Sequence, residues 1–133
     1  MPTPYQQDRF PYAPVLPVRL SAPHEAAYAV SFSALIDTGA DFTLVPLAWL
    51  VQIDAPESRY AYLRGLWSEQ RQVTLYLVDL HLTTGVLPGV EVAGIDDETE
   101  QEIVLGRNVL NQLILLLDGS HLQTDVLERR PSR

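Results

Sequence analysis

The chain of 133 residues contains no cysteine and no lysine. The lack of cysteine excludes disulfide bonds and metal sites built from thiolates. Positive charge is scarce, because nine arginines stand against 17 acidic residues and the formal net charge is −8. This balance argues against a nucleic-acid partner, since nucleic-acid binding depends on basic surfaces.

Long hydrophobic runs are also missing from the sequence. No run is longer than that at residues 113–117, which is far too short to cross a bilayer. Residues 1–17 contain five prolines and lack the continuous apolar stretch of a signal peptide. We therefore expect a cytoplasmic protein without a membrane segment.

A hydrophobic fraction of 47% is enough for one folded domain with a core of its own. We expect this domain to cover residues 14–127. Residues 1–13 are predicted to form a flexible N-terminal segment and residues 128–133 a flexible tail.

Most of the domain is predicted to be β-structure. Residues 28–36 alternate with the period of two that is typical of a half-buried strand. Residues 59–82 are predicted to form a long hairpin with its tip near residues 65–68. Short helices are predicted at residues 47–53, next to Pro46, and at residues 108–112. The pattern indicates an all-β protein.

One turn stands between two apolar runs, in the stretch Ala-Leu-Ile-Asp-Thr-Gly-Ala-Asp-Phe-Thr-Leu-Val-Pro at residues 34–46. Its apolar flanks predict a buried turn with Asp37 at the tip. A lone buried carboxylate is costly unless it is hydrogen-bonded, neutralised or functional. Gly39 allows close approach of the main chain, so its amide could donate to this carboxylate.

The run from Asp37 through Thr38, Gly39, Ala40 and Asp41 to Thr43 resembles the active-site loop of retroviral-type (retropepsin-like) aspartic proteases. A second stretch, Ile-Val-Leu-Gly-Arg-Asn-Val-Leu at residues 103–110, is similar to that family's apolar strand, Gly-Arg-Asn turn and short helix. Two motifs in the family's order are far more specific than either alone. The resemblance covers about residues 14–127.

The resemblance implies a retropepsin-like closed β-barrel with one short C-terminal helix and a flap hairpin, assembled as a homodimer. It also implies an aspartic endopeptidase with Asp37 as the catalytic residue. In such enzymes two facing carboxylates share one proton, because like charges so close cannot both ionise. This chain has a single Asp-Thr-Gly, so the second carboxylate would come from a second copy.

The resemblance gives roles to further residues. Thr38, Gly39 and Ala40 would complete the active-site loop. Asp41 would lie in the substrate groove and form a structural ion pair with Arg107.

The predicted flap tip supplies the remaining substrate contacts. Gly65, Leu66 and Trp67 would bind a peptide or protein substrate, although Trp67 could instead pack on the domain. The resemblance implies neither a cofactor nor a metal. The acidic run at residues 96–102 lacks the ligand spacing of an EF-hand and is interpreted as a solvated loop.

Simpler interpretations exist for each feature. Asp37 could be a structural turn residue and Arg107 a surface charge, while the three histidines lack ligand spacing. A rival hypothesis keeps the fold but discards catalysis, leaving a silent dimeric peptide-binding or scaffolding module. The intact Asp-Thr-Gly-Ala favours the enzyme, because a binding module needs no pair of repelling acids.

Overall fold

The computed structural model describes residues 2–64, 68–97 and 101–132. Within these ranges the chain forms ten strands and two short helices. In chain order they are β1 Thr3–Pro4, β2 Val15–Ser21, β3 Phe32–Ile36, β4 Thr43–Pro46, α1 Leu47–Gln52, β5 Glu57–Arg64, β6 Gln70–Leu82, β7 Gly85–Ile95, β8 Val104–Leu105, α2 Arg107–Leu110, β9 Ile114–Asp118 and β10 Gln123–Leu127.

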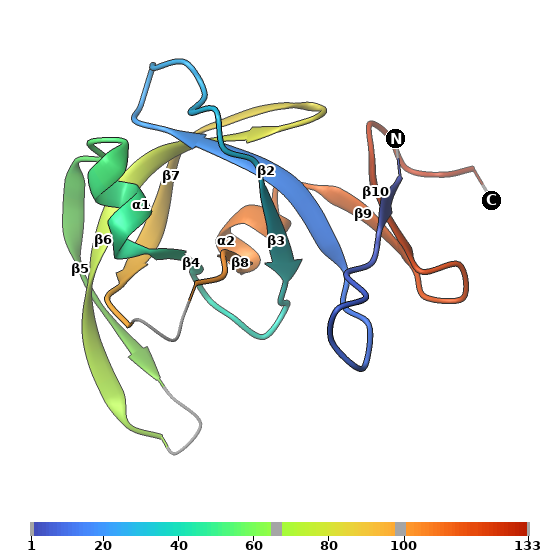
Figure 1. The fold of residues 1–133 in the computed structure, drawn as a ribbon, viewed down its shortest axis with the longest axis horizontal. Helices are drawn as coiled ribbons and strands as arrows, with labels where there is room; N and C mark the ends of the chain where they lie inside the picture. Colours follow the sequence, from blue (N-terminus) through green and yellow to red (C-terminus); the bar gives the residue numbers. More distant parts are fainter. Residues whose placement is uncertain (1, 65–67, 98–100, 133) are drawn as a thin grey trace.

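Six of the strands close into a barrel (Figure 1). Their order is β2-β3-β8-β4-β7-β6. The barrel closes where β6 pairs antiparallel with β2, with Leu80 opposite Leu20. Strand β5 extends the sheet beyond β6. The predicted all-β class and closed barrel are thus confirmed.

The barrel is filled by the apolar side chains that alternate along its strands. Strand β2 contributes Leu16, Val18 and Leu20, and helix α1 adds Leu50. Helix α2 buries Val109 and Leu110 in the same core. Both predicted short helices are therefore present and hold their places by packing, since helices this short are unstable alone.

The predicted long hairpin is formed by β5 and β6. Their antiparallel register runs from Glu57 opposite Tyr76 to Arg64 opposite Gln70. Figure 1 shows this hairpin reaching beyond the barrel. The predicted tip residues Gly65, Leu66 and Trp67 lie outside the described residues.

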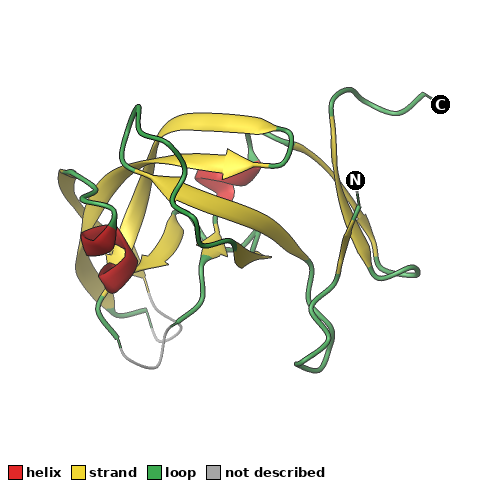
Figure 2. Cartoon of the chain, turned by 45° about the horizontal axis from the view of Figure 1, so that its top comes forward, coloured by secondary structure: helices red, strands yellow, loops and turns green. Residues whose placement is uncertain are grey.

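A second, three-stranded sheet has the order β1-β10-β9 and carries both ends of the chain (Figure 2). Thr3 pairs with Thr124, and the Tyr5 amide donates to the Leu122 carbonyl at 2.9 Å. The sequence predicted a flexible segment at residues 1–13, yet part of it adds a strand to β10 in this structure. The flexibility itself, and that of residues 128–133, stays a prediction.

Candidate active site

The loop between β3 and β4 presents the Asp37 side chain. Strand β3 ends one residue earlier, and the Asp37 amide donates to the Leu105 carbonyl of β8 at 3.1 Å. The Gly39 amide donates to Asp37 Oδ1 at 2.9 Å. A Cβ at residue 39 would lie 3.2 Å from that same oxygen, so a side chain there would crowd the carboxylate. The loop therefore holds one carboxylate through main-chain contacts.

The prediction that this turn is buried is wrong for the single chain. Asp37, Thr38 and Gly39 are all exposed. The apolar flanks have a different cause, because Ile36 and Val45 are the inward-facing residues of two barrel strands. The residues on both sides of the turn are therefore buried in the barrel, whereas the turn between them is exposed to solvent.

Arg107, at the start of α2, closes this loop from the other side. Its guanidinium forms an ion pair with Asp41 and donates from Nη1 to the Thr38 carbonyl at 2.8 Å. Its amide donates to the Ala40 carbonyl, also at 2.8 Å. This is the ion pair that the resemblance implied. Because 46% of the Arg107 side chain and 71% of the Asp41 side chain are exposed, the pair adds little to the free energy of unfolding and mainly positions the loop.

The next residue of α2, Asn108, holds Thr43, the first residue of β4. Its Oδ1 accepts from both the amide and the hydroxyl of Thr43 at 3.0 Å, and its Nδ2 donates to the Glu91 carbonyl at 2.7 Å. Thr43 is fully buried, and its Oγ1 accepts from the Gly106 amide at 3.1 Å. A Cβ at residue 106 would lie 2.5 Å from backbone atoms of Phe42, so only glycine fits.

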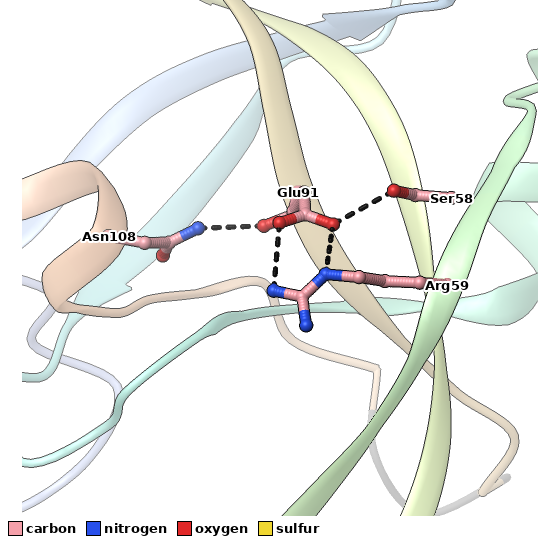
Figure 3. A network of polar contacts seen from close by, with 4 residues as sticks. All are labelled: Ser58, Arg59, Glu91 and Asn108. Atoms are coloured by element: carbon pink, nitrogen blue, oxygen red, sulfur yellow. Dashed lines mark hydrogen bonds and ion pairs between the residues drawn. The ribbon is translucent and has the colours of Figure 1, made fainter.

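The Glu91 side chain continues this network to the hairpin (Figure 3). Arg59 donates to its two oxygens at 3.0 and 3.1 Å, and Ser58 donates at 2.8 Å. The hydrogen bonds from Arg59 hold the pKa of Glu91 below its ordinary value, with Ser58 adding to the effect. The network joins the base of the hairpin, β7 and α2 beside the Asp37 loop.

Two adjoining cavities lie beside the hairpin, and the first of them also borders the Asp37 loop. One, of about 360 Å³, is lined by Gly39, Ala40 and Asp41. The other, of about 310 Å³, extends toward β6 and β7. Both are lined by Leu44, Leu63 and Arg64. A larger hollow of about 560 Å³ lies beside Arg9 and Glu102, but no residue of the Asp37 loop lines it.

The structure thus brings together most residues of the predicted site. Asp37 through Asp41 form one loop, and Arg107 contacts it. The sequence does not predict the contact between Arg59 and Glu91, because the two residues lie 32 positions apart and no local pattern links them.

No family model matches this sequence, and no curated protein matches it. Among solved structures, the EIAV protease complexed with the inhibitor HBY-793 does, with a TM-score of 0.57. The match covers 80% of this chain and 92% of that chain at 16% sequence identity. The chain has a retropepsin-like fold.

The retropepsin-like fold agrees with the resemblance carried by the two motifs. At this identity the likeness establishes the fold alone. Within residues 2–64, 68–97 and 101–132, no three potential metal-ligating side chains come together. Neither helix in the described part of the chain has the length and apolar character needed to span a bilayer.

Proposed function

We propose that this protein is an aspartic endopeptidase that acts as a homodimer. The observation that carries the proposal is the Asp37 carboxylate, exposed on a loop held by hydrogen bonds and next to a cavity in a retropepsin-like fold. An exposed acid on so constrained a loop suits catalysis, because its position is fixed before a substrate arrives.

The proposed reaction needs two Asp37 carboxylates, one from each copy. The ionised one takes a proton from a water molecule, and the hydroxide adds to the scissile carbonyl carbon. The protonated one donates its proton to the carbonyl oxygen. Collapse of this tetrahedral intermediate breaks the C–N bond as the nitrogen takes up a proton. The OH group of the water thus ends on the new carboxylic acid and a proton ends on the new amine.

The proposed substrate is an extended peptide or a protein segment. It would lie in the space between the Asp37 loop and the β5–β6 hairpin, which holds one of the two cavities and leads into the other. An extended chain there can form main-chain hydrogen bonds as an added strand. Asp41 and the hairpin tip at Gly65, Leu66 and Trp67 are the proposed contacts, with the hairpin closing as a flap.

Cleavage of a peptide library by the parent protein and an Asp37→Asn variant tests this proposal. The variant keeps an acceptor for the Gly39 amide but cannot ionise, so we expect cleavage to fall at least about 100-fold. Asp54→Asn is the matched control, because Asp54 is exposed in the turn after α1 and outside the proposed site. The control should cleave like the parent.

Cleavage at the parental rate by Asp37→Asn would reject the proposed mechanism. A parent that binds peptides but cleaves none of them between acid and neutral pH would instead support the silent binding module. No feature of the described residues favours that module. The cytoplasmic location expected from the sequence stays a prediction.

A further inference from the structure

The smaller of the two cavities beside the hairpin has walls of two kinds. Leu44, Leu63 and Ile95 give it an apolar surface. Arg64 and Arg71 line the same cavity of about 310 Å³ with positive charge. Binding cavities are commonly apolar with a few charged or polar groups that fix the orientation of the ligand. This cavity therefore suits a group with an apolar stem and a charged end.

The pairing of the hairpin strands places both arginines beside this cavity. Arg71 lies directly opposite Leu63 in the antiparallel register, so the two side chains leave the sheet on the same face. Leu63 packs there against the core cluster around Leu75. Arg64 is the last residue of β5 and lines both cavities, including the one that borders the Asp37 loop.

These two arginines differ from the arginines that hold the framework together. Arg9, Arg59 and Arg107 each form an ion pair with a carboxylate. Within the part of the chain that the structure describes, neither Arg64 nor Arg71 forms an ion pair, and both are exposed. Their guanidinium groups are thus available to an anionic group from outside the chain.

Carboxylates also line the two cavities, but they already have partners. Glu102 pairs with Arg9, and Asp41 forms the ion pair with α2 described above. Glu69 and Asp97 each interact with other residues as well. The charge that remains for a ligand in this space is the positive charge of the two hairpin arginines.

We propose that Arg64 and Arg71 select substrates that carry a glutamate close to the cleaved bond. The inference rests on the proposed function, whose substrate passes through this space. The glutamate carboxylate accepts hydrogen bonds from the guanidinium groups, and its methylene groups pack against Leu44 and Leu63. Glutamate fits better than aspartate, because its longer stem passes the apolar walls before the carboxylate reaches the arginines.

The charge of the whole chain makes this local contact necessary for an acidic substrate. The formal net charge of −8 repels an acidic peptide, so a glutamate is favoured only where arginine lies close to it. Charge-assisted hydrogen bonds are about twice as strong as neutral ones. At the preferred position we therefore expect kcat/KM to be at least about tenfold higher for glutamate than for glutamine, which has the same shape without the charge.

A positional peptide library measures this preference. In each pool one position is fixed as glutamate, glutamine or lysine, and the other positions are randomised. For the parent protein we expect one position at which the glutamate pool is cleaved fastest and the lysine pool slowest. Because the contact is between exposed charges, the ratio of glutamate to glutamine cleavage should fall as the salt concentration rises.

Substitution of the arginines identifies the residues responsible. Arg64→Gln and Arg71→Gln should each lower the ratio of glutamate to glutamine cleavage to about threefold or less. The ratio cancels any general effect of a substitution on activity. Arg64→Glu should reverse the preference, so that the lysine pool is cleaved faster than the glutamate pool. Arg19→Gln is the matched control, because Arg19 is exposed on β2 and lines neither cavity, and it should keep the parental ratio.

A binding measurement separates this inference from the proposed function. The Asp37→Asn variant is titrated with fluorescently labelled glutamate and glutamine pools, and binding is followed by fluorescence anisotropy. We expect the glutamate pool to bind more tightly, and we expect this difference to disappear when Arg64→Gln is added.

Two results would overturn the inference while the proposed enzyme stands. One is cleavage with equal kcat/KM for glutamate and glutamine at every position, or with a preference that neither arginine substitution changes. The other is a preference of the parent for lysine, which would mean that the carboxylates around the cavity select the substrate. A parent that cleaves nothing but binds glutamate selectively through Arg64 would refute the enzyme and support the arginine contact. Neither cleavage nor selective binding would refute both.

Discussion

Replacing Asn108 by alanine should destabilise the protein strongly, although the side chain removed is small and polar. The side-chain amide of Asn108 makes three hydrogen bonds, two with Thr43 and one with the Glu91 carbonyl. Alanine would leave the Thr43 amide, the Thr43 hydroxyl and that carbonyl without these partners. Because Thr43 is fully buried, water cannot easily replace all of them.

An unpaired buried polar group costs about 1–3 kcal/mol. Asn108 itself is half-buried, so some water can enter and the lower figure applies. Three groups at about 1 kcal/mol each give a loss of about 3 kcal/mol in the free energy of unfolding. For a chain of 133 residues, an unfolding entropy of about 2.1 cal/mol/K per residue converts this loss into a fall in Tm of about 10 °C.

Urea unfolding followed by tryptophan fluorescence measures this loss, at one fixed protomer concentration because dimerisation would shift the midpoint. Gln112→Ala is the control, since it removes one exposed hydrogen bond, from Gln112 Nε2 to the Asn108 carbonyl, and should cost at most about 0.5 kcal/mol. If Asn108→Ala is as stable as this control, the hydrogen bonds around Thr43 do not stabilise the protein as we argue.

Two further predictions concern the same framework. Gly106→Ala would place Cβ 2.5 Å from backbone atoms of Phe42 and should cost at least about 2 kcal/mol, whereas Gly119→Ala meets nothing within 4 Å and should cost at most about 0.5 kcal/mol by urea unfolding. Equal stabilities would refute the close approach. Asp79 is buried and accepts hydrogen bonds from two backbone N–H groups, which lower the pKa of its carboxyl group. The ionised carboxylate therefore stabilises the folded protein above the ordinary pKa of Asp, and this stabilisation is lost as pH falls through the lowered pKa. The stability difference between the parent and Asp79→Asn should therefore shrink as pH falls below about 4, and a constant difference from pH 7 to 2 would contradict this.

The sequence predicts the local features of this protein well. The period-two pattern, the turn residues and the two motifs each depend on neighbouring residues. The β5–β6 hairpin and both helices are found where expected, and the strand expected at residues 28–36 is present over its second half, as β3 Phe32–Ile36. The pairing of Asp41 with Arg107 could also be anticipated, because the resemblance links the two motifs to each other.

The features that the sequence did not predict all depend on distant segments. The barrel closes between Leu20 and Leu80, and nothing local to either strand specifies that partner. The contact of Arg59 with Glu91 depends on the same closure of the sheet. The exposure of Asp37 does not follow from its sequence, because its apolar neighbours along the chain point into the barrel while the turn between them is exposed.

The claim that each copy supplies half of one catalytic centre can be tested by mixing. Parent chains are refolded together with a ninefold excess of Asp37→Asn chains, and peptide cleavage is measured with substrate in excess. If one centre needs Asp37 from both copies, random pairing leaves about one parent chain in ten with a parent partner, so cleavage per parent chain falls about tenfold. Cleavage per parent chain that is unchanged by the excess would contradict the account.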